Sequence, residues 1–459
     1  MNEDLRIREK YEEIRNLLNE KEYRALRGML NDMLPYDISV FMSESQAKER
    51  ALIYRILSKE LAAEVFAYLD GDIQHQLISS FSEAEIASVL DELFLDDTVD
   101  FLEEMPAYIV DKVLKVLSKT RPETRQMINM FLKYPFDSAG SIMTIEYVSV
   151  NQNYTVEDAI SKIRRVGLNK ETVYTIYVTN ENRILEGVVS LRKLLFANNG
   201  DIIGHLMDSN LIYAYTNDDQ EKISALFRKY GLLSLPILDK ENRLVGIVTV
   251  DDIVDVIEEE NTEDFEKMAA LRPSEKTYLK SSVWDLAKNR LLWLLVLMAS
   301  GMLIGLILGA FEKALVVGSL VVFMPMITGT GGNAGSQAST LVIRGMALGE
   351  ISSKDYAKVL WKELRVALSI GIILGAFNFV RIVIQYRNIE QDPVKIAFIV
   401  AISLVFTVVA AKITGGMLPM LAKKIKVDPA LMAAPLISTI LDAVGLVFYF
   451  GMATLVLGL

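Results

Sequence analysis

The chain of 459 residues contains no cysteine and only two histidines, His75 and His205. The lack of cysteine excludes disulfides and thiolate chemistry and is typical of a reducing compartment. Neither histidine lies in the apolar part of the chain, and no His-Glu-x-x-His motif occurs, which argues against an intramembrane protease. No Gly-x-x-x-x-Gly-Lys-Ser/Thr loop is present either. We therefore expect a protein that is not an enzyme.

Basic residues are also scarce relative to acids, with 48 Lys and Arg against 59 Asp and Glu and a net charge of −11. This balance argues against nucleic acid as a partner, because a phosphate footprint needs clustered basic side chains. The charges lie mainly in residues 1–288, whereas residues 289–459 are mostly apolar. The first residues lack the apolar core of a signal peptide, so we expect the acidic soluble part to stay in the cytoplasm.

Residues 1–136 show only helical periodicity, in loosely similar units that follow one another every ~12–15 residues. This pattern predicts an all-α superhelical domain of stacked helix pairs. From Phe81 to Glu104 there are nine acids and no base. Asp96, Asp100 and Glu103 follow at i, i+4 and i+7, so negative charge gathers on one helix face. Such a run is either a solvated face or part of a cation site.

Residues 137–258 contain two similar halves, whose Glu-Asn-Arg turns at 181–183 and 241–243 are separated by 60 positions. Each half reads as a helix, two strands joined by this turn, and a second helix. The pattern resembles a tandem pair of CBS domains, a Bateman α/β module, with repeats at 137–202 and 203–264. The resemblance implies that Gly246, Thr249 and Asp252 can hold a nucleotide such as ATP. The first repeat has Ser190, but Lys193 replaces the acid.

A second acidic tract follows the last strand, with nine acids and no base between Asp251 and Glu266. Two such tracts repel each other unless a hard divalent cation bridges their carboxylate oxygens. Solubility alone is the other explanation for these charges. Residues 265–288 are expected to form an amphipathic linker, or plug, helix at the membrane surface.

Residues 289–459 are expected to form a transmembrane domain of five helices, over about 289–311, 314–342, 362–386, 394–421 and 430–459. The loops before the third and fifth spans are rich in Lys and Arg, whereas the first outer loop has only Lys313. The positive-inside rule then predicts a multi-pass plasma-membrane protein with cytoplasmic N-terminal domains and an outer C-terminus.

The last predicted span carries one acid, Asp442, in an otherwise apolar stretch. A carboxylate near the middle of a membrane costs ~2.5–3.5 kcal/mol on insertion scales, so it indicates a function or a partner. Ser438 and Thr439 share its helix face. Pro435, which cannot donate a hydrogen bond, should leave the carbonyl of Leu431 free. These oxygens favour a cation pathway, and pairing of the acid with Lys412 is the alternative.

The second predicted span contains Pro325 and the sequence Thr-Gly-Thr-Gly-Gly-Asn-Ala-Gly-Ser-Gln at 328–337. Asn333 and Gln337 lie four residues apart and so share a face. Amides at membrane depth line water or are buried in protein. The proline and the glycines are expected to loosen this helix and to offer backbone carbonyls.

This order of domains, with Thr-Gly-Gly-Asn-Ala-Gly-Ser-Gln and Ser-Thr-Ile-Leu-Asp in the membrane part, resembles the MgtE family of magnesium channels over the whole chain. The resemblance implies a homodimer in membrane lipid, with Mg²⁺ as both substrate and regulatory ligand. It assigns ion selectivity to Asp442 and pore lining to Asn333. It assigns regulatory Mg²⁺ to a set of cytosolic acids: Asp96, Asp100, Asp219, Glu221, Asp252, Asp255, Glu260, Glu263 and Asp264.

The predicted function is therefore influx of Mg²⁺ down its electrochemical gradient, closed by cytosolic Mg²⁺ bound among the acidic domain, the CBS module and the linker. The membrane potential supplies ~2.3 kcal/mol per charge per 100 mV, so influx needs no ATP hydrolysis. An ion-coupled divalent-cation carrier or exporter on the same scaffold remains the alternative.

Overall fold

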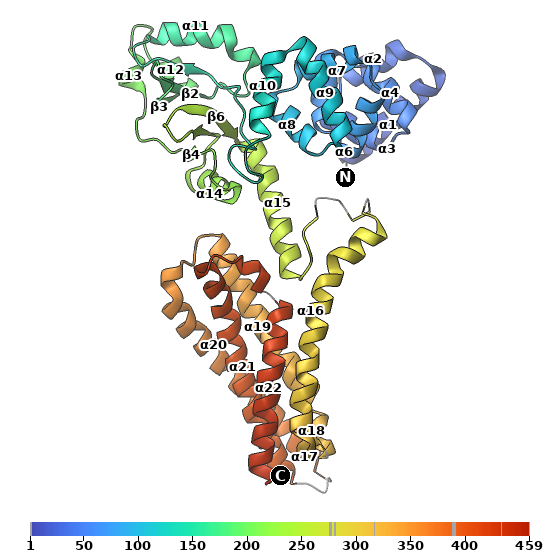
Figure 1. The fold of residues 1–459 in the computed structure, drawn as a ribbon, viewed down its shortest axis with the longest axis vertical. Coiled ribbons are helices and arrows are strands. Elements are labelled where there is room, and N and C mark those ends of the chain that lie inside the picture. The colour runs from blue at the N-terminus through green and yellow to red at the C-terminus, as the bar shows by residue number, and fades with distance from the viewer. Residues whose placement is uncertain are drawn as a thin grey trace. The chain divides into compact units, whose positions relative to one another are not determined.

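The computed structural model describes residues 2–274, 278–279, 281–315, 317–387, 392–432 and 434–458 (Figure 1). The chain divides into two compact units, residues 1–257 and 258–459. The first holds the acidic helices and both CBS-like repeats, and the second holds the apolar helices. Each unit is described separately below.

The first unit begins with helices only, as the sequence predicts. They are α1 (Asn2–Glu20), α2 (Tyr23–Asn31), α3 (Pro35–Glu44), α4 (Ala47–Ile56), α5 (Lys59–Ala67), α6 (Gly71–Ser80), α7 (Glu83–Glu92), α8 (Leu95–Glu103), α9 (Ala107–Thr120) and α10 (Pro122–Phe131). Helix α3 packs on α5, α5 on α7 and α7 on α9, so alternate helices stack. Ser58 and Ser82 cap the helices that follow them, which fixes where two of the units begin.

Two three-stranded sheets follow, each flanked by helices. The first repeat contains β1 (Ser149–Val150), α11 (Val156–Val166), η1 (Gly167–Asn169), β2 (Thr175–Thr179), β3 (Leu185–Ser190), α12 (Leu191–Phe196) and α13 (Ile203–Leu206). The second contains β4 (Ala214–Tyr215), α14 (Gln220–Tyr230), β5 (Ser234–Leu238), β6 (Leu244–Thr249) and α15 (Val250–Met268). In each sheet the first strand is parallel and the third antiparallel to the central one. The predicted helix–strand–strand–helix repeat is confirmed.

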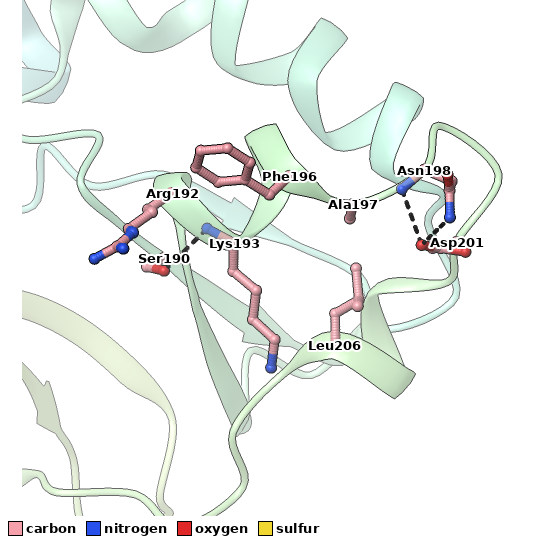
Figure 2. A pocket seen from close by; sticks show the side chains of 8 residues that line it. All are labelled: Ser190, Arg192, Lys193, Phe196, Ala197, Asn198, Asp201 and Leu206. Carbon is pink, nitrogen blue, oxygen red and sulfur yellow. Dashed lines mark hydrogen bonds between the residues drawn. The ribbon is translucent and has the colours of Figure 1, made fainter.

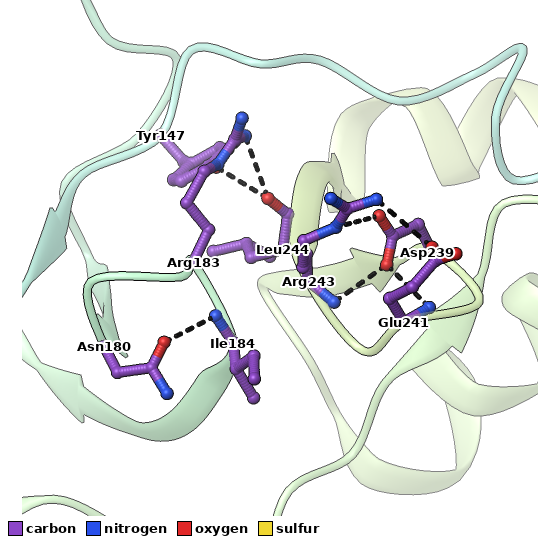
Figure 3. Close-up of polar contacts among 8 residues, drawn as sticks. All are labelled: Tyr147, Asn180, Arg183, Ile184, Asp239, Glu241, Arg243 and Leu244. Carbon is purple, nitrogen blue, oxygen red and sulfur yellow. Dashed lines mark hydrogen bonds and ion pairs between the residues drawn. The ribbon is translucent and has the colours of Figure 1, made fainter.

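The two Glu-Asn-Arg turns lie side by side (Figure 3). Each turn contains a residue in the left-handed region, Arg183 with φ 62° and Asn242 with φ 60°. The guanidinium of Arg183 crosses to the other repeat and donates to the carbonyl of Leu244 at 3.0 Å. Arg243 instead binds Asp239 within its own turn, with Nε 2.7 Å from Oδ2. These contacts join the repeats into one module.

Helix α15 runs without a break from the second repeat to Met268, and the next helix, α16, begins at Val283. The described residues between them form no helix. The prediction of one separate amphipathic helix over 265–288 is therefore wrong. Its first residues extend α15, and its last ones begin α16.

The second unit contains α16 (Val283–Ala310), α17 (Glu312–Leu315), α18 (Gly318–Val321), α19 (Met324–Ala347), η2 (Ser353–Asp355), α20 (Tyr356–Gln385), α21 (Pro393–Lys424), η3 (Pro429–Met432) and α22 (Ala434–Leu457). Four of the described helices are long and apolar enough to cross a membrane, namely α16, α20, α21 and most of α22. The second predicted span differs, because it divides into α17, α18 and α19 and carries the glycine and amide residues. Helix length and apolarity thus identify four candidate spans among the described residues, and not the five that the sequence predicts.

Helix α19 is continuous, which corrects the expectation of a loosened helix. Pro325 lies in its first turn, where a missing N–H leaves no hydrogen bond unmade. The glycines instead serve close packing. A Cβ at Gly415 of α21 would overlap the carbonyl oxygen of Gly335 of α19.

Glycines at four-residue spacing behave differently on two helices. A Cβ at Gly371 or Gly375 of α20 would lie 3.2 Å or 3.1 Å from the backbone of α21, so the two helices pack closely at these glycines. A Cβ at Gly301, Gly305 or Gly309 of α16 would meet no described atom within 4 Å apart from its chain neighbours and the nearby backbone of its own helix. Helix α16 therefore presents its small residues outward in the single chain.

Candidate functional site

Helices α19 and α22 are in contact and antiparallel, as their glycine contacts show. A Cβ at Gly332 would lie 3.0 Å from Ser438 Oγ, and one at Gly445 would lie 3.7 Å from Ile327. A Cβ at Gly331 would lie 3.7 Å from Leu441. Asp442 therefore lies level with the Thr-Gly-Thr-Gly-Gly-Asn segment, where backbones approach closely because side chains are absent.

Asp442 is half-buried on this helix pair. The alternative pairing with Lys412 does not occur, because Lys412 Nζ donates to Gln337 Oε1 at 3.2 Å. Among the residues that the structure describes, no ion pair involves Asp442. No basic side chain of the described part of the chain therefore neutralises this carboxylate.

A stripe of small and polar residues runs along the exposed side of α19. It comprises Gly329, Asn333, Gln337, Thr340 and Arg344, which we call the polar stripe. Its members follow at three- or four-residue intervals, so they occupy one face of the helix. The remaining faces of α19 are largely buried against α21 and α22. Polar groups on the exposed face of a helix that packs among long apolar helices favour contact with water or a second chain over contact with lipid.

The two hydroxyl residues near Asp442, Ser438 and Thr439, have different surroundings. Thr439 Oγ1 donates to the carbonyl of Pro435 at 3.1 Å, so its hydrogen is used within the helix. The side chain of Ser438 lies against Gly332. Pro435 lies in the first turn of α22, and Leu431 belongs to the separate short helix η3. The prediction that Pro435 frees a carbonyl inside the span is therefore wrong, because no helical bond is interrupted there.

The first unit contains a cluster of carboxylates centred on Asp96 of α8. Asp96 is 8% exposed, and its Oδ1 has no hydrogen-bond partner among the described residues. Burial raises its pKa well above the ordinary value, with further contributions from neighbouring carboxylates. These neighbours are Asp252, Asp97, Glu171 and Glu146. We call these five residues, with Asp251, the carboxylate cluster.

Other members of the carboxylate cluster are perturbed in the same direction. Burial, with help from Asp251, raises the pKa of Asp97 to about 6. Burial also raises the pKa of Asp252 to about 6, against the hydrogen bond from Thr249. Burial and then Asp252 raise the pKa of Glu171 to about 7. Each shift means that burial, with repulsion from neighbouring carboxylates as a smaller cause, disfavours the charged form, so a bound cation or protons would stabilise this arrangement.

The sequence identified only Asp96 and Asp252 of the carboxylate cluster. Asp97 and Asp251 lie in the acidic tracts and were detectable there. Glu146 and Glu171 lie outside the tracts, so only the fold reveals them. Among the described residues, no group of three or more Asp, Glu or His side chains is arranged closely enough to hold one metal ion. The cluster is therefore a concentration of carboxylates rather than a preformed metal cage.

The other predicted regulatory acids lie elsewhere. Asp100 and Asp255 are exposed, as are Asp219 and Glu221 at the start of α14. Asp219 Oδ1 caps that helix by accepting from the N–H of Glu221 at 2.9 Å. Glu260, Glu263 and Asp264 belong to the part of α15 in the second unit.

The base-free sequence of its tract implied that Glu263 has no basic partner. In the structure Glu263 forms an ion pair with Lys267, with Nζ 2.8 Å from Oε1. The same ammonium lies 2.7 Å from Asp428 Oδ2 in the loop before α22. The base that balances this tract therefore stands one residue beyond its end.

The three predicted nucleotide residues have structural roles. Thr249 Oγ1 donates to Asp252 Oδ2 at 2.6 Å and holds that carboxylate at the start of α15. A Cβ at Gly246 would lie 2.8 Å from the carbonyl of Thr144, so the glycine admits the segment that pairs with β6 at Ile247. The side chain of Asp252 is thus oriented by its hydrogen bond from Thr249 at the start of α15, and it belongs to the carboxylate cluster.

The first repeat contains a pocket of about 460 Å³ beside the equivalent helix start (Figure 2). Ser190, Lys193 and Phe196 of β3 and α12 contribute to its lining, together with Asn198 and Asp201. Ser190 Oγ accepts from the backbone N–H of Lys193 at 3.2 Å. Where the second repeat has the acid Asp252, this pocket has a base.

Three family models match successive parts of the chain. Residues 33–137 match the MgtE intracellular N domain, and residues 139–200 and 203–259 match the CBS domain. Residues 324–452 match the MgtE divalent cation transporter model.

Full-length relatives agree with these matches. The magnesium transporter MgtE of Thermus thermophilus is 36% identical over 97% of this chain and 98% of its own length. The magnesium transporter MgtE of Bacillus subtilis is 32% identical over 95% of each chain.

Solved structures resemble the soluble part. The cytosolic domain of the Mg²⁺ channel MgtE in complex with ATP is 36% identical, covering 53% of this chain and 98% of that one, with a TM-score of 0.51. The soluble part of a magnesium transporter is 29% identical, covering 55% of this chain and 99% of that one, with a TM-score of 0.52.

Proposed function

The chain belongs to the MgtE family of divalent cation transporters, and on that premise we propose that it is a channel for Mg²⁺ influx. The observation that carries this proposal is the position of Asp442. Its carboxylate makes no ion pair among the described residues and lies level with the polar stripe of α19. Mg²⁺ loses its water reluctantly and takes few protein ligands, so one carboxylate beside a polar helix face suits a largely hydrated ion.

The proposed channel is a homodimer in the plasma membrane. A single chain leaves the polar stripe exposed, and lipid cannot satisfy its amides and hydroxyls. A second copy facing the same stripe would enclose a water-filled route on the two-fold axis. Each chain would then contribute one Asp442. We further propose that α19 makes the fifth span and that the basic loops face the cytoplasm, with the C-terminus outside.

Closure by cytosolic Mg²⁺ is the regulatory half of the proposal. The carboxylate cluster joins α8 to the start of α15, and its repulsion favours separation of these elements when cations are scarce. Bound Mg²⁺ would stabilise the compact form and shift the population toward it. Asp100, Asp255, Glu260 and Asp264 are further proposed ligands of regulatory ions. Asp219 and Glu221 are weaker candidates, because Asp219 already caps a helix.

ATP is a proposed ligand of the CBS module, because the relative with 36% identity binds it in its cytosolic domain. Gly246 and Thr249 are the residues first expected to contact it. Mg²⁺ and nucleotide would then compete or cooperate through Asp252, which is shared by both predicted sites.

The test of the channel is transport by the purified dimer in liposomes that contain a magnesium-sensitive dye. Asp442→Asn keeps the shape of the side chain and removes its charge, so we expect Mg²⁺ entry to fall at least tenfold. Glu312→Gln is the matched control, since it removes one exposed acid of the same unit outside the predicted site. Wild-type entry in Asp442→Asn, with dimers intact, would refute the pore assignment.

A further inference from the structure

Lys412 is a base at membrane depth that the transport chemistry does not require. It is 4% exposed in the middle of α21, where the cost of an unpaired charge is high. Its hydrogen-bond acceptor is Gln337 Oε1, at 3.2 Å, on the polar stripe of α19. The alkyl stem is therefore buried between helices, while the ammonium reaches the stripe.

The helix register places this ammonium on one side of Asp442. Asp442 is level with Gly331 of α19, because Leu441 contacts that glycine. Gln337 lies six residues further along the same helix, or ~9 Å at 1.5 Å per residue. This direction leads toward the end of α19 and the start of α22, where the basic loops lie. An ion that leaves Asp442 for the proposed cytoplasmic side must pass Gln337 and Lys412.

The hydrogen bond also fixes what Gln337 presents to the route. Its carbonyl oxygen accepts from Lys412 with one of its two lone pairs, so a cation at the other would meet the ammonium, and the amide N–H₂ group offers only donors. The water shell of a cation offers hydrogens outward and cannot donate to N–H groups. Gln337, whose amide was expected to line water or to be buried in protein, is therefore a poor ligand for a cation in this orientation.

We propose that Lys412, held by Gln337, is a specificity-determining residue that weakens the Asp442 site for the divalent cation so that the ion can leave it. Conduction requires a site tight enough to admit an ion and weak enough to release it. A fixed positive charge one to two turns away lowers the affinity for a divalent ion more than for a monovalent one, because the Coulomb energy scales with ionic charge. The proposal rests on the proposed channel function.

The test measures Mg²⁺ entry into liposomes with a magnesium-free interior, so that the cytosolic acids are empty. In Lys412→Met, which keeps length and loses charge, we expect the half-saturating external Mg²⁺ to fall about tenfold. The maximal rate should fall as well, because release becomes slower. Lys412→Arg keeps the charge and should resemble the wild type. A pure packing role would instead alter Lys412→Arg and Lys412→Met alike, which would overturn the proposal.

A second variant guards against a misfolded Lys412→Met. Gln337→Glu retains the contact and adds a compensating negative charge, so half-saturation should again fall. An unchanged or higher half-saturating concentration in the folded variants would contradict the inference. Asp442→Asn, measured in parallel, separates the two failures. If it transports normally, the channel proposal fails, whereas if it is inactive and Lys412 variants are unchanged, only the role of Lys412 fails.

Discussion

The ammonium of Lys267 lies 2.7 Å from Asp428 Oδ2 and 2.8 Å from Glu263 Oε1, and so ties the last turn of α15 to the loop before α22. Burial lowers the pKa of Lys267, but the hydrogen bonds that its ammonium donates to both carboxylates outweigh burial and hold the pKa above its ordinary value. Asp428 Oδ1 also accepts from the N–H of Ala430 at 2.8 Å, which fixes the loop itself. The end of α15 therefore has a permanent cation among its acids.

Removal of this cation should loosen the end of α15. In Lys267→Met we expect the loss of roughly 1 kcal/mol from the local contact, because the pair is only partly buried. Hydrogen exchange of residues 263–268 and 425–430 should become about fivefold faster. Lys222→Met, whose ion pair with Asp218 lies within one helical turn, is the control that should leave these segments unchanged. If these segments exchange in Lys267→Met at the same rate as in the wild type, packing alone holds the contact.

Neutralisation of the carboxylate cluster should make the channel insensitive to cytosolic Mg²⁺. In Asp96→Asn with Asp252→Asn, we expect the Mg²⁺ concentration that half-closes the channel to rise at least tenfold, since two buried ligands are lost. Recordings from excised patches with magnesium varied on the cytoplasmic side measure this directly. Asp111→Asn, which removes an exposed acid of α9, should close normally. Normal closure of the double variant would exclude the cluster as the sensor.

The stability of the first unit should depend on pH when Mg²⁺ is absent. Acids whose pKa is raised by folding bind more protons in the folded state, so their contribution favours folding at low pH and is lost as pH rises. Asp97 and Asp252 lose it near pH 6 and Glu171 near pH 7. Each pKa unit corresponds to ~1.4 kcal/mol. Calorimetry of the full chain should therefore show a melting temperature that falls between about pH 4 and about pH 7.

General repulsion in an acidic protein gives a trend of the same sign, so a variant must separate the two causes. Asp97→Asn with Asp252→Asn should flatten the pH dependence, whereas Asp111→Asn with Glu123→Gln, which removes two exposed acids, should not. Added Mg²⁺ at pH 8 should restore the melting temperature of the wild type. A pH dependence that is equal in both double variants would contradict a role for the cluster.

The glycine contact between α19 and α21 should tolerate no side chain. Gly415→Ala forces the two backbones apart, and we expect a loss of about 1–3 kcal/mol in unfolding free energy. Gly301→Ala on α16 meets nothing within 4 Å in the chain and should be neutral or slightly stabilising. Thermal unfolding in detergent compares them. If Gly301→Ala were the more harmful, α16 would pack against a second copy through that glycine.

The sequence by itself determined the order of the parts. Helical periodicity, the duplicated Glu-Asn-Arg turns and the apolar runs are local patterns, and the fold keeps them because backbone hydrogen bonds and burial act over neighbouring residues. Asp442 was detectable for the same reason, since an acid in an apolar span is conspicuous without any structure.

Only the tertiary structure decided the partners. Glu146 and Glu171 join Asp96 because the chain folds back on itself, and their sequence context carries no sign of this. The sequence alone allows Lys412 to pair with either Gln337 or Asp442. In the structure the register of three packed helices places it against Gln337. Charges act through space, so the pairing of distant residues depends on packing that no single segment encodes.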